Sequence, residues 1–172
     1  MPKYDRPDPS EYAPYYGGYI KTAPQGDLLQ ILERQGAETA ALIAGLPEAR
    51  GDHAYEPGKW TIKEVLLHLA DAERVFGYRA LRFARGDQTP LPGFEQNDWT
   101  PESGAGKLTL KDLSEELRAV RGATLALLRH LPDSAPTRRG TASGKEISVR
   151  ALAWIIAGHE AHHLRVLRER YL

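Results

Sequence analysis

Apolar residues recur with a helical period in four stretches of the chain, each about twenty residues long. These stretches cover residues 28–46, 62–86, 110–131 and 149–171. Each follows a residue type that caps helix N-termini, and the four caps are Asp27, Thr61, Thr109 and Ser148. Thr61 and Glu64 have the spacing of a capping box, and prolines follow the first and third stretches. The pattern predicts four amphipathic helices.

Strand signals are weak throughout, so we expect an all-α protein, a four-helix bundle. Residues 1–26 are rich in Pro, Gly and Tyr and predict an irregular N-terminal arm, ordered by the burial of its tyrosines. Residues 86–108 predict a long loop between the second and third helices, either a functional lid or a surface excursion. Within it, the candidate lid or substrate contacts are Phe94, Gln96 and Trp99.

The composition narrows the classes of function. A chain of 172 residues fits one domain, residues 1–172. Its 23 Lys and Arg balance 23 Asp and Glu, so no overall charge favours binding to nucleic acid or to an anionic membrane. Residues 1–7 are polar and broken by proline, and no apolar run could span a bilayer, so we expect a cytoplasmic protein. Cysteine is absent, so any thiol chemistry requires an external thiol.

The strongest chemical signal is residues 158–163, which read Gly-His-Glu-Ala-His-His and hold three of the six histidines. The segment matches His-Glu-x-x-His, in which two histidines of a metalloprotease bind zinc and the glutamate is the base. The protease interpretation weakens because those enzymes need a further ligand well downstream of the motif, and only residues 164–172 follow. The glycine and third histidine of the longer protease signature are also missing. Glu160 is then interpreted as an exposed helix residue or as a partner of a metal ligand.

On a helix of 3.6 residues per turn, His159 and His163 lie about 40° apart, within the apolar arc of the fourth helix. Both are therefore expected to point into the bundle, where such a pair can chelate one metal ion. His162 falls on the flank of that arc. A third ligand should come from a facing helix, and His68 lies at the edge of the apolar face of the second helix.

The two remaining histidines have simpler interpretations. His53 lies in a predicted loop and is expected to face solvent. His130 lies at the end of the third helix, where a positive charge is favourable.

The histidine segments resemble those of a known family, the DinB/YfiT-like superfamily. Residues 58–69, which read Gly-Lys-Trp-Thr-Ile-Lys-Glu-Val-Leu-Leu-His-Leu, resemble the segment that carries its first metal histidine. Residues 158–163 resemble the segment that carries the other two, and the likeness extends to the tyrosine-rich arm and to residues 79–87 and 91–96. The resemblance implies an up-down-down-up bundle, a homodimer, and a divalent metal held by His68, His159 and His163.

The family includes transferases that use bacillithiol or mycothiol, a maleylpyruvate isomerase, and proteins described as metal-dependent hydrolases. The resemblance therefore implies an enzyme that transfers a low-molecular-weight thiol to an electrophilic small molecule. A metal-dependent hydrolase and a non-catalytic metal-binding or ligand-binding stress protein are the alternatives. Zn or Ni suits three histidines, as do Fe and Co. Arg79 is a candidate to hold a carboxylate of the substrate or thiol, and a salt bridge with a bundle glutamate is its alternative role.

Overall fold

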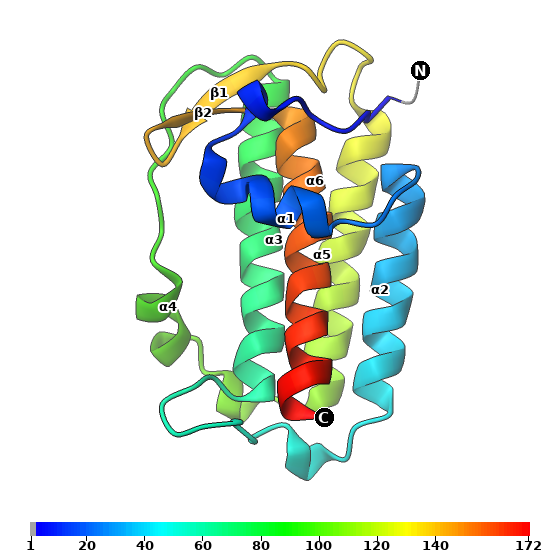
Figure 1. Ribbon diagram of the computed structural model, residues 1–172, viewed down its shortest axis with the longest axis vertical. Coiled ribbons are helices and arrows are strands. Elements are labelled where there is room, and N and C mark those ends of the chain that lie inside the picture. Colours follow the sequence, from blue (N-terminus) through cyan, green and yellow to red (C-terminus); the bar gives the residue numbers. More distant parts are fainter. Residues whose placement is uncertain (1–2) are drawn as a thin grey trace.

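Four long helices lie side by side in the computed structural model, which describes residues 3–172 (Figure 1). They are α2 (Leu28–Ala44), α3 (Ile62–Ala84), α5 (Leu110–His130) and α6 (Val149–Val166), which a π-helical turn extends over Leu167–Tyr171. All four predicted caps accept a hydrogen bond from a first-turn amide, and Thr61 and Glu64 form the predicted capping box. The all-α four-helix bundle is confirmed.

The direction of the helices explains the long connection in the middle of the chain. In Figure 1, α2 runs downward, α3 and α5 both run upward, and α6 runs downward, which is the expected up-down-down-up order. Because α3 and α5 are parallel, the chain between them must travel the full length of the bundle. Residues 85–109 make this crossing, and they carry the short helix α4 (Gln96–Glu102) and a 3-10 turn at Ala105–Lys107.

Two smaller elements lie across the bundle. The arm forms 3-10 turns at Pro9–Glu11 and Pro14–Tyr16 and then a helix, α1 (Gly17–Thr22), which packs against α6. The predicted arm is therefore less irregular than expected, and its residues 1–2 lie outside the described part. The second element is an antiparallel hairpin of β1 (Arg139–Ala142) and β2 (Lys145–Ser148), in which Arg139 pairs with Ser148. No strand was predicted there, because each strand has only four residues.

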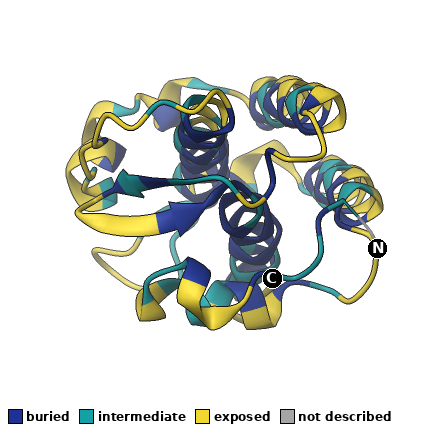
Figure 2. Cartoon of the chain, turned by 90° about the horizontal axis from the view of Figure 1, so that it is seen from above, coloured by how far each residue is buried: buried dark blue, intermediate teal, exposed yellow. Residues whose placement is uncertain are grey.

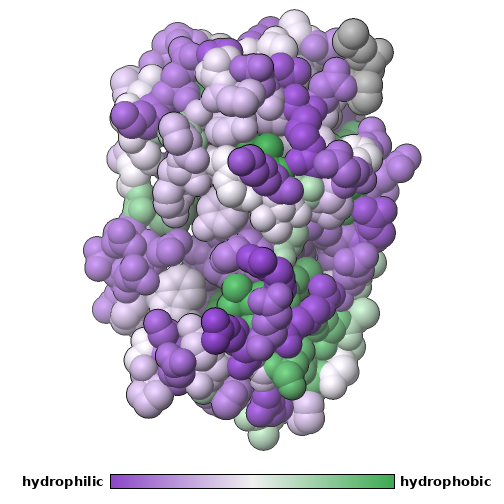
Figure 3. Space-filling model, viewed as in Figure 1, coloured by the Kyte–Doolittle hydropathy of each residue, from purple (hydrophilic) through white to green (hydrophobic). Residues whose placement is uncertain are grey.

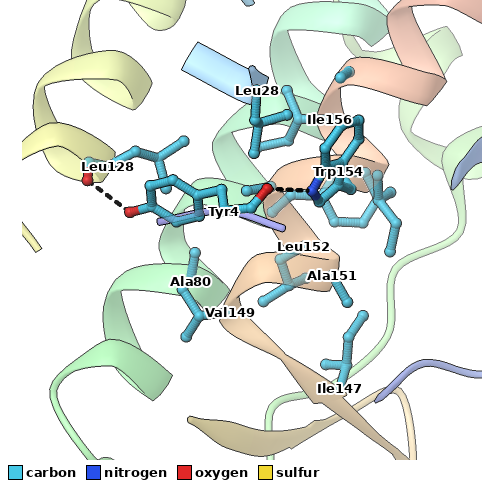
Figure 4. Close-up of a cluster of buried hydrophobic side chains, with 14 of the residues drawn as sticks. Tyr4, Leu28, Ala80, Leu128, Ile147, Val149, Ala151, Leu152, Trp154 and Ile156 are labelled. Atoms are coloured by element: carbon cyan, nitrogen blue, oxygen red, sulfur yellow. Dashed lines mark hydrogen bonds between the residues drawn. The ribbon is translucent and has the colours of Figure 1, made fainter. Parts of the chain in front are cut away.

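The apolar core has two parts, one toward each end of the bundle. The larger part joins the arm and hairpin to the helices, and its α6 residues end at Ala157 (Figure 4). Tyr4 of the arm is held in it at both ends, because its hydroxyl donates to the Leu128 carbonyl at 2.6 Å and its own carbonyl accepts from Trp154 Nε1 at 3.0 Å. The buried sides of the helices face inward when the bundle is seen from above (Figure 2).

The smaller part of the core fills the opposite end, with Ile62, Leu66 and Leu164 among its buried residues. An apolar area is visible toward the lower end of the otherwise mostly hydrophilic face in Figure 3. None of the helices in residues 3–172 combines the length and apolar character needed to cross a membrane. Between the two apolar parts lies a layer of polar side chains from α3, α5 and α6.

Candidate metal centre

Three histidines meet in this polar layer. His68 comes from α3, and His159 and His163 come from consecutive turns of α6. The Nε2 atom of His159 lies 3.0 Å from that of His68 and 3.2 Å from that of His163. The ligand atoms of all three lie within 4.8 Å of one another. The structure thus brings together the three residues that the sequence singled out, and it leaves His162, His53 and His130 outside the cluster.

The cluster fits a metal ion both in spacing and in protonation. Two nitrogen ligands of a tetrahedral zinc ion lie roughly 3.3 Å apart, close to the observed separations. Burial lowers the pKa of His68 to about 4, and burial together with the neighbouring His68 and His162 lowers the pKa of His163 to about 3. Burial also holds the pKa of His159 well below its ordinary value. All three imidazoles are therefore neutral at pH 7 and can offer lone pairs to a cation.

A buried ion cluster lies next to the histidines. Arg121 of α5 donates to Glu73 Oε2 of α3 at 2.7 Å and to Glu160 Oε2 of α6 at 2.8 Å. The other oxygen of Glu160 accepts from Thr39 at 2.6 Å. All four side chains are buried. Two carboxylates against one guanidinium leave a net negative charge in this low-dielectric layer, which favours a cation among the neighbouring histidines.

This cluster corrects one interpretation made from the sequence. Glu160 is not an exposed helix residue, since only 5% of it is accessible. Nor is it placed as a protease base, because both of its carboxylate oxygens are occupied by Arg121 and Thr39. Its role is to join α6 to α5 and α2 immediately beside His159.

A cavity of about 140 Å³ opens onto the histidines. His68 and His159 form part of its floor with Ala72 and Phe76. Its walls come from three segments far apart in the sequence, namely the arm, the long connection and the hairpin turn. The wall residues are Tyr15, Tyr16, Tyr19, Phe94, Glu95, Gln96 and Ser143. This arrangement can hold a small molecule within reach of the imidazoles.

The arm reaches the site because a glycine lets it approach α6 closely. A Cβ atom at Gly158 would lie only 1.9 Å from the carbonyl oxygen of Tyr19, so no larger residue fits there without displacing α1. The Tyr19 ring then packs edge-on against His159, with ring centres 5.3 Å apart, and against His162 at 5.6 Å. Burial raises the pKa of Tyr19 to about 12, so its phenol remains protonated at neutral pH.

The predicted lid residues lie where the loop meets the site. Phe94 and Gln96 line the cavity, whereas Trp99 packs against Phe94, with ring centres 4.8 Å apart, and lines a small adjoining hollow beside His68. Arg79 is buried and donates from Nη2 to the Pro92 carbonyl at 2.9 Å and to Ser143 Oγ at 3.1 Å. The alternative role proposed for Arg79, a salt bridge with a bundle glutamate, is wrong for the part of the chain that the structure describes.

Sequence reasoning missed the contributions of Tyr19 and Ser143 to the site. The tyrosines of the arm indicated only that the segment would be ordered, and nothing in their spacing placed them over α6. Ser143 and Gly144 form a Ser-Gly dipeptide, which is a turn signal. That signal could have located the hairpin turn, although not its position beside His68.

Comparison with known proteins places the chain among relatives with matching folds. YfiT of Bacillus subtilis (strain 168), which carries the provisional name metal-dependent hydrolase, is 24% identical over 145 residues, covering 82% of this chain and 80% of YfiT. A protein of Oceanobacillus iheyensis with the same provisional name is 27% identical over 138 residues, covering 79% of each chain.

Two solved structures share the fold. The structure of YfiT, described as having an unusual four-helix bundle topology, superposes with a TM-score of 0.72 at 20% identity, covering 96% of this chain and 90% of YfiT. The mycothiol-dependent maleylpyruvate isomerase superposes with a TM-score of 0.66 at 16% identity, covering 84% of this chain and 61% of the isomerase. A sequence model of the DinB superfamily matches residues 31–167, which include all three clustered histidines. The chain therefore belongs to the DinB superfamily.

Proposed function

We propose that this protein is a divalent-metal-dependent enzyme that transfers a low-molecular-weight thiol to an electrophilic small molecule. The observation that carries the proposal is the convergence of three neutral imidazoles, two of which, those of His68 and His159, line a cavity that substrates can enter. Three protein ligands leave a position open for an exchangeable group, as in catalytic sites. The name of one fold relative, a mycothiol-dependent isomerase, supports a thiol as cosubstrate.

His68, His159 and His163 would hold the metal, and their nitrogen donors suit zinc or nickel, with iron or cobalt also compatible. When bound, such an ion supplies Lewis acidity and lowers the pKa of a thiol or water molecule that contacts it. The chain contains no cysteine, so no protein thiol competes for that position. A thiol that reacts here must come from solution.

The chain's own residues prepare the cavity for a small electrophile. Phe76, Phe94 and Tyr16 offer apolar walls that bind a carbon skeleton and exclude water from it. The protonated Tyr19 phenol and the Gln96 amide offer hydrogen-bond donors. These groups orient a substrate above His159 without titrating near neutral pH.

The test is thiol conjugation by the purified, metal-loaded protein. Monochlorobimane is incubated with the protein and with bacillithiol, mycothiol or other small thiols, and conjugate fluorescence is followed. We expect His163→Ala to reduce the rate at least a hundredfold, because it removes one of three metal ligands. His130→Ala, which changes an exposed histidine at the end of α5, should leave the rate unchanged. Lack of conjugation with every thiol would contradict the proposal.

Hydrolysis by metal-activated water is the second candidate, favoured by the provisional names of the relatives from Bacillus subtilis and Oceanobacillus iheyensis. It predicts turnover of a small ester or amide that needs the metal and does not need a thiol. Release of p-nitrophenol from nitrophenyl esters, with and without chelator and thiol, separates the two reactions.

We also propose that the protein forms a homodimer through α3 and α5. A mainly apolar groove of about 570 Å³ runs between these helices, and Tyr78 and Leu81 are exposed along it. An apolar surface of this kind is typical of an interaction site. Light scattering should give the mass of a dimer for the natural chain and that of a monomer for Leu81→Glu, whereas a monomeric natural chain would contradict this proposal.

A further inference from the structure

A serine hydroxyl and a buried guanidinium meet at the edge of the cavity. Ser143 is the first residue of the two-residue turn between β1 and β2, where Ala142 pairs with Lys145. It lines the cavity together with His68 and His159. Its Oγ accepts a hydrogen bond of 3.1 Å from Nη2 of Arg79, which lies on α3 and is 64 residues away in the sequence. The hairpin is thereby fixed against the helix that supplies the first histidine.

The backbone at Ser143 favours a different residue. Its φ angle is 52°, in the left-handed region that glycine adopts most easily, and the following Gly144 has a φ of 72°. Asn-Gly and Gly-Gly are the usual choices for such hairpin turns. A serine held in this conformation is under local strain, and strain of this kind concentrates at functional sites. The hydroxyl is thus the feature that distinguishes this residue from a better turn former.

The hydrogen bond from Arg79 leaves the serine hydroxyl free to act as a donor. A hydroxyl has one proton and two lone pairs, and at Ser143 the guanidinium occupies a lone pair. Within residues 3–172 no acceptor receives the Ser143 proton, and the residue is exposed at the cavity. A charged donor behind a hydroxyl polarises it and strengthens the hydrogen bond that it donates in turn.

The charge of Arg79 indicates what the hydroxyl binds. Only 2% of Arg79 is accessible, yet no carboxylate in residues 3–172 forms a salt bridge with it. Arg121, which is similarly buried, pairs with two carboxylates. The one acidic wall residue, Glu95, is exposed, and its Oε1 accepts from the Asn97 amide at 3.1 Å. The Arg79 edge of the cavity therefore carries a buried positive charge without a counter-ion, which favours an anion.

We propose that Ser143 and Arg79 form a carboxylate subsite, in which Ser143 donates a hydrogen bond to a carboxylate of the bound molecule. Arg79 is a positioning residue that orients the hydroxyl and supplies the positive charge. The inference rests on the proposed function, because it assigns a substrate class, small carboxylates, to the same cavity. It also accounts for the presence of serine, rather than glycine or asparagine, at a left-handed turn position.

The test compares two thiols that differ in the carboxylate. The cobalt-loaded protein is titrated with 3-mercaptopropionate and with 1-propanethiol, and the thiolate-to-cobalt absorption band measures binding. We expect the natural chain to bind 3-mercaptopropionate at least tenfold more tightly than 1-propanethiol. Ser143→Gly should remove most of this preference while the protein remains folded, because glycine suits the turn.

Ser134→Gly is the matched control, since Ser134 Oγ accepts from Arg138 at the same distance of 3.1 Å but lies outside the cavity lining. It should keep the full preference. Arg79→Gln should reduce the preference as Ser143→Gly does. Equal binding of the two thiols by the natural chain, or a preference that survives Ser143→Gly, would overturn the subsite and leave the metal proposal standing. If neither thiol perturbs the cobalt spectrum, both proposals are wrong.

Discussion

At the scale of single residues, burial determines what the three histidines can do. Each imidazole lies in a layer between two apolar clusters, and His68 and His159 are only 6% accessible. A protonated imidazole there would lose its hydration and would face two more imidazoles at close range. Burial is the largest cause of the lowered pKa of all three residues. The same desolvation keeps them ready to bind a cation and makes the metal-free protein sensitive to acid.

The first prediction is a loss of stability of the metal-free protein as pH falls below 6.5. In that range the unfolded chain takes up protons at these histidines, whereas the folded chain does not until about pH 4 at His68 and about pH 3 at His163. The folded state therefore binds fewer protons than the unfolded state in this range. The free energy of unfolding decreases as the pH is lowered, by up to about 1.4 kcal/mol per pH unit for each histidine. Urea unfolding in chelator at pH 7, 6 and 5 measures this slope.

The slope can be assigned to individual histidines with single variants. His163→Asn should reduce this slope by about 1.4 kcal/mol per pH unit, because about one fewer proton is taken up on unfolding. Gly122→Ala, a substitution in α5 that changes no titratable group, should leave the slope as in the natural chain. A free energy of unfolding that does not change between pH 7 and pH 5 would show that the three imidazoles are not desolvated in the folded protein.

At the scale of elements, the position of α1 depends on one residue of α6. The Tyr19 carbonyl lies where the side chain of any residue larger than glycine at position 158 would begin. We predict that Gly158→Ala displaces α1 and destabilises the protein by about 1–3 kcal/mol, the usual cost of overpacking. Loss of the Tyr19 contact with His159 should also open the cavity. Urea unfolding measures the first effect, and protease cleavage within the arm measures the second.

A matched alanine substitution separates this clash from the helix propensity of glycine. Gly122 lies in α5, and a Cβ atom there would meet nothing within 4 Å. Gly122→Ala should therefore stabilise the protein by about 0.5–1 kcal/mol, because alanine favours the helical backbone. If Gly158→Ala were as stable as Gly122→Ala, the close approach of α1 to α6 would be incorrect.

The elements also show why part of the fold could be predicted from the sequence. Each long helix begins at a capping residue and presents a broad apolar face, and these local signals located all four. The hairpin has four-residue strands, and its pairing depends on tertiary contacts such as the hydrogen bond between Leu91 and Thr141. Such contacts leave little local pattern in the sequence.

Only those parts of the site that follow from the positions of residues on helices could be predicted from the sequence. The spacing of His159 and His163 identified their shared face, and the apolar face of the second helix pointed to His68 as the third candidate. The family resemblance implied the same three residues. Glu160 was misplaced because a helical-wheel argument assumes that one side of the helix faces solvent. In the structure α6 is covered by α1, α2 and α3, so nearly every residue from Val149 to Glu160 is buried. The contributions of the arm and the hairpin could not be derived from local pattern at all.

At the scale of the whole molecule, the histidine cluster connects the two halves of the core. The larger apolar part uses α6 up to Ala157, the smaller part uses α6 from Leu164 onward, and the three histidines lie between them. His68 belongs to α3 and the other two ligands belong to α6, so an ion bound by all three would link these helices in the middle of the bundle. Metal binding should therefore stabilise the protein globally.

The last prediction concerns this linkage. A ligand that binds only the folded state stabilises it by about 2.7 kcal/mol at a hundredfold excess over its dissociation constant. For a domain of this size, that corresponds to a rise in Tm of roughly 5–10 °C. Calorimetry with zinc and with chelator should show this rise for the natural chain and for His130→Ala. His68→Ala should lose stoichiometric metal and the rise together, because the remaining pair lies on one helix and cannot link α3 to α6. An equal rise in His68→Ala would show that zinc binds elsewhere, and elemental analysis of both variants would confirm which site holds it.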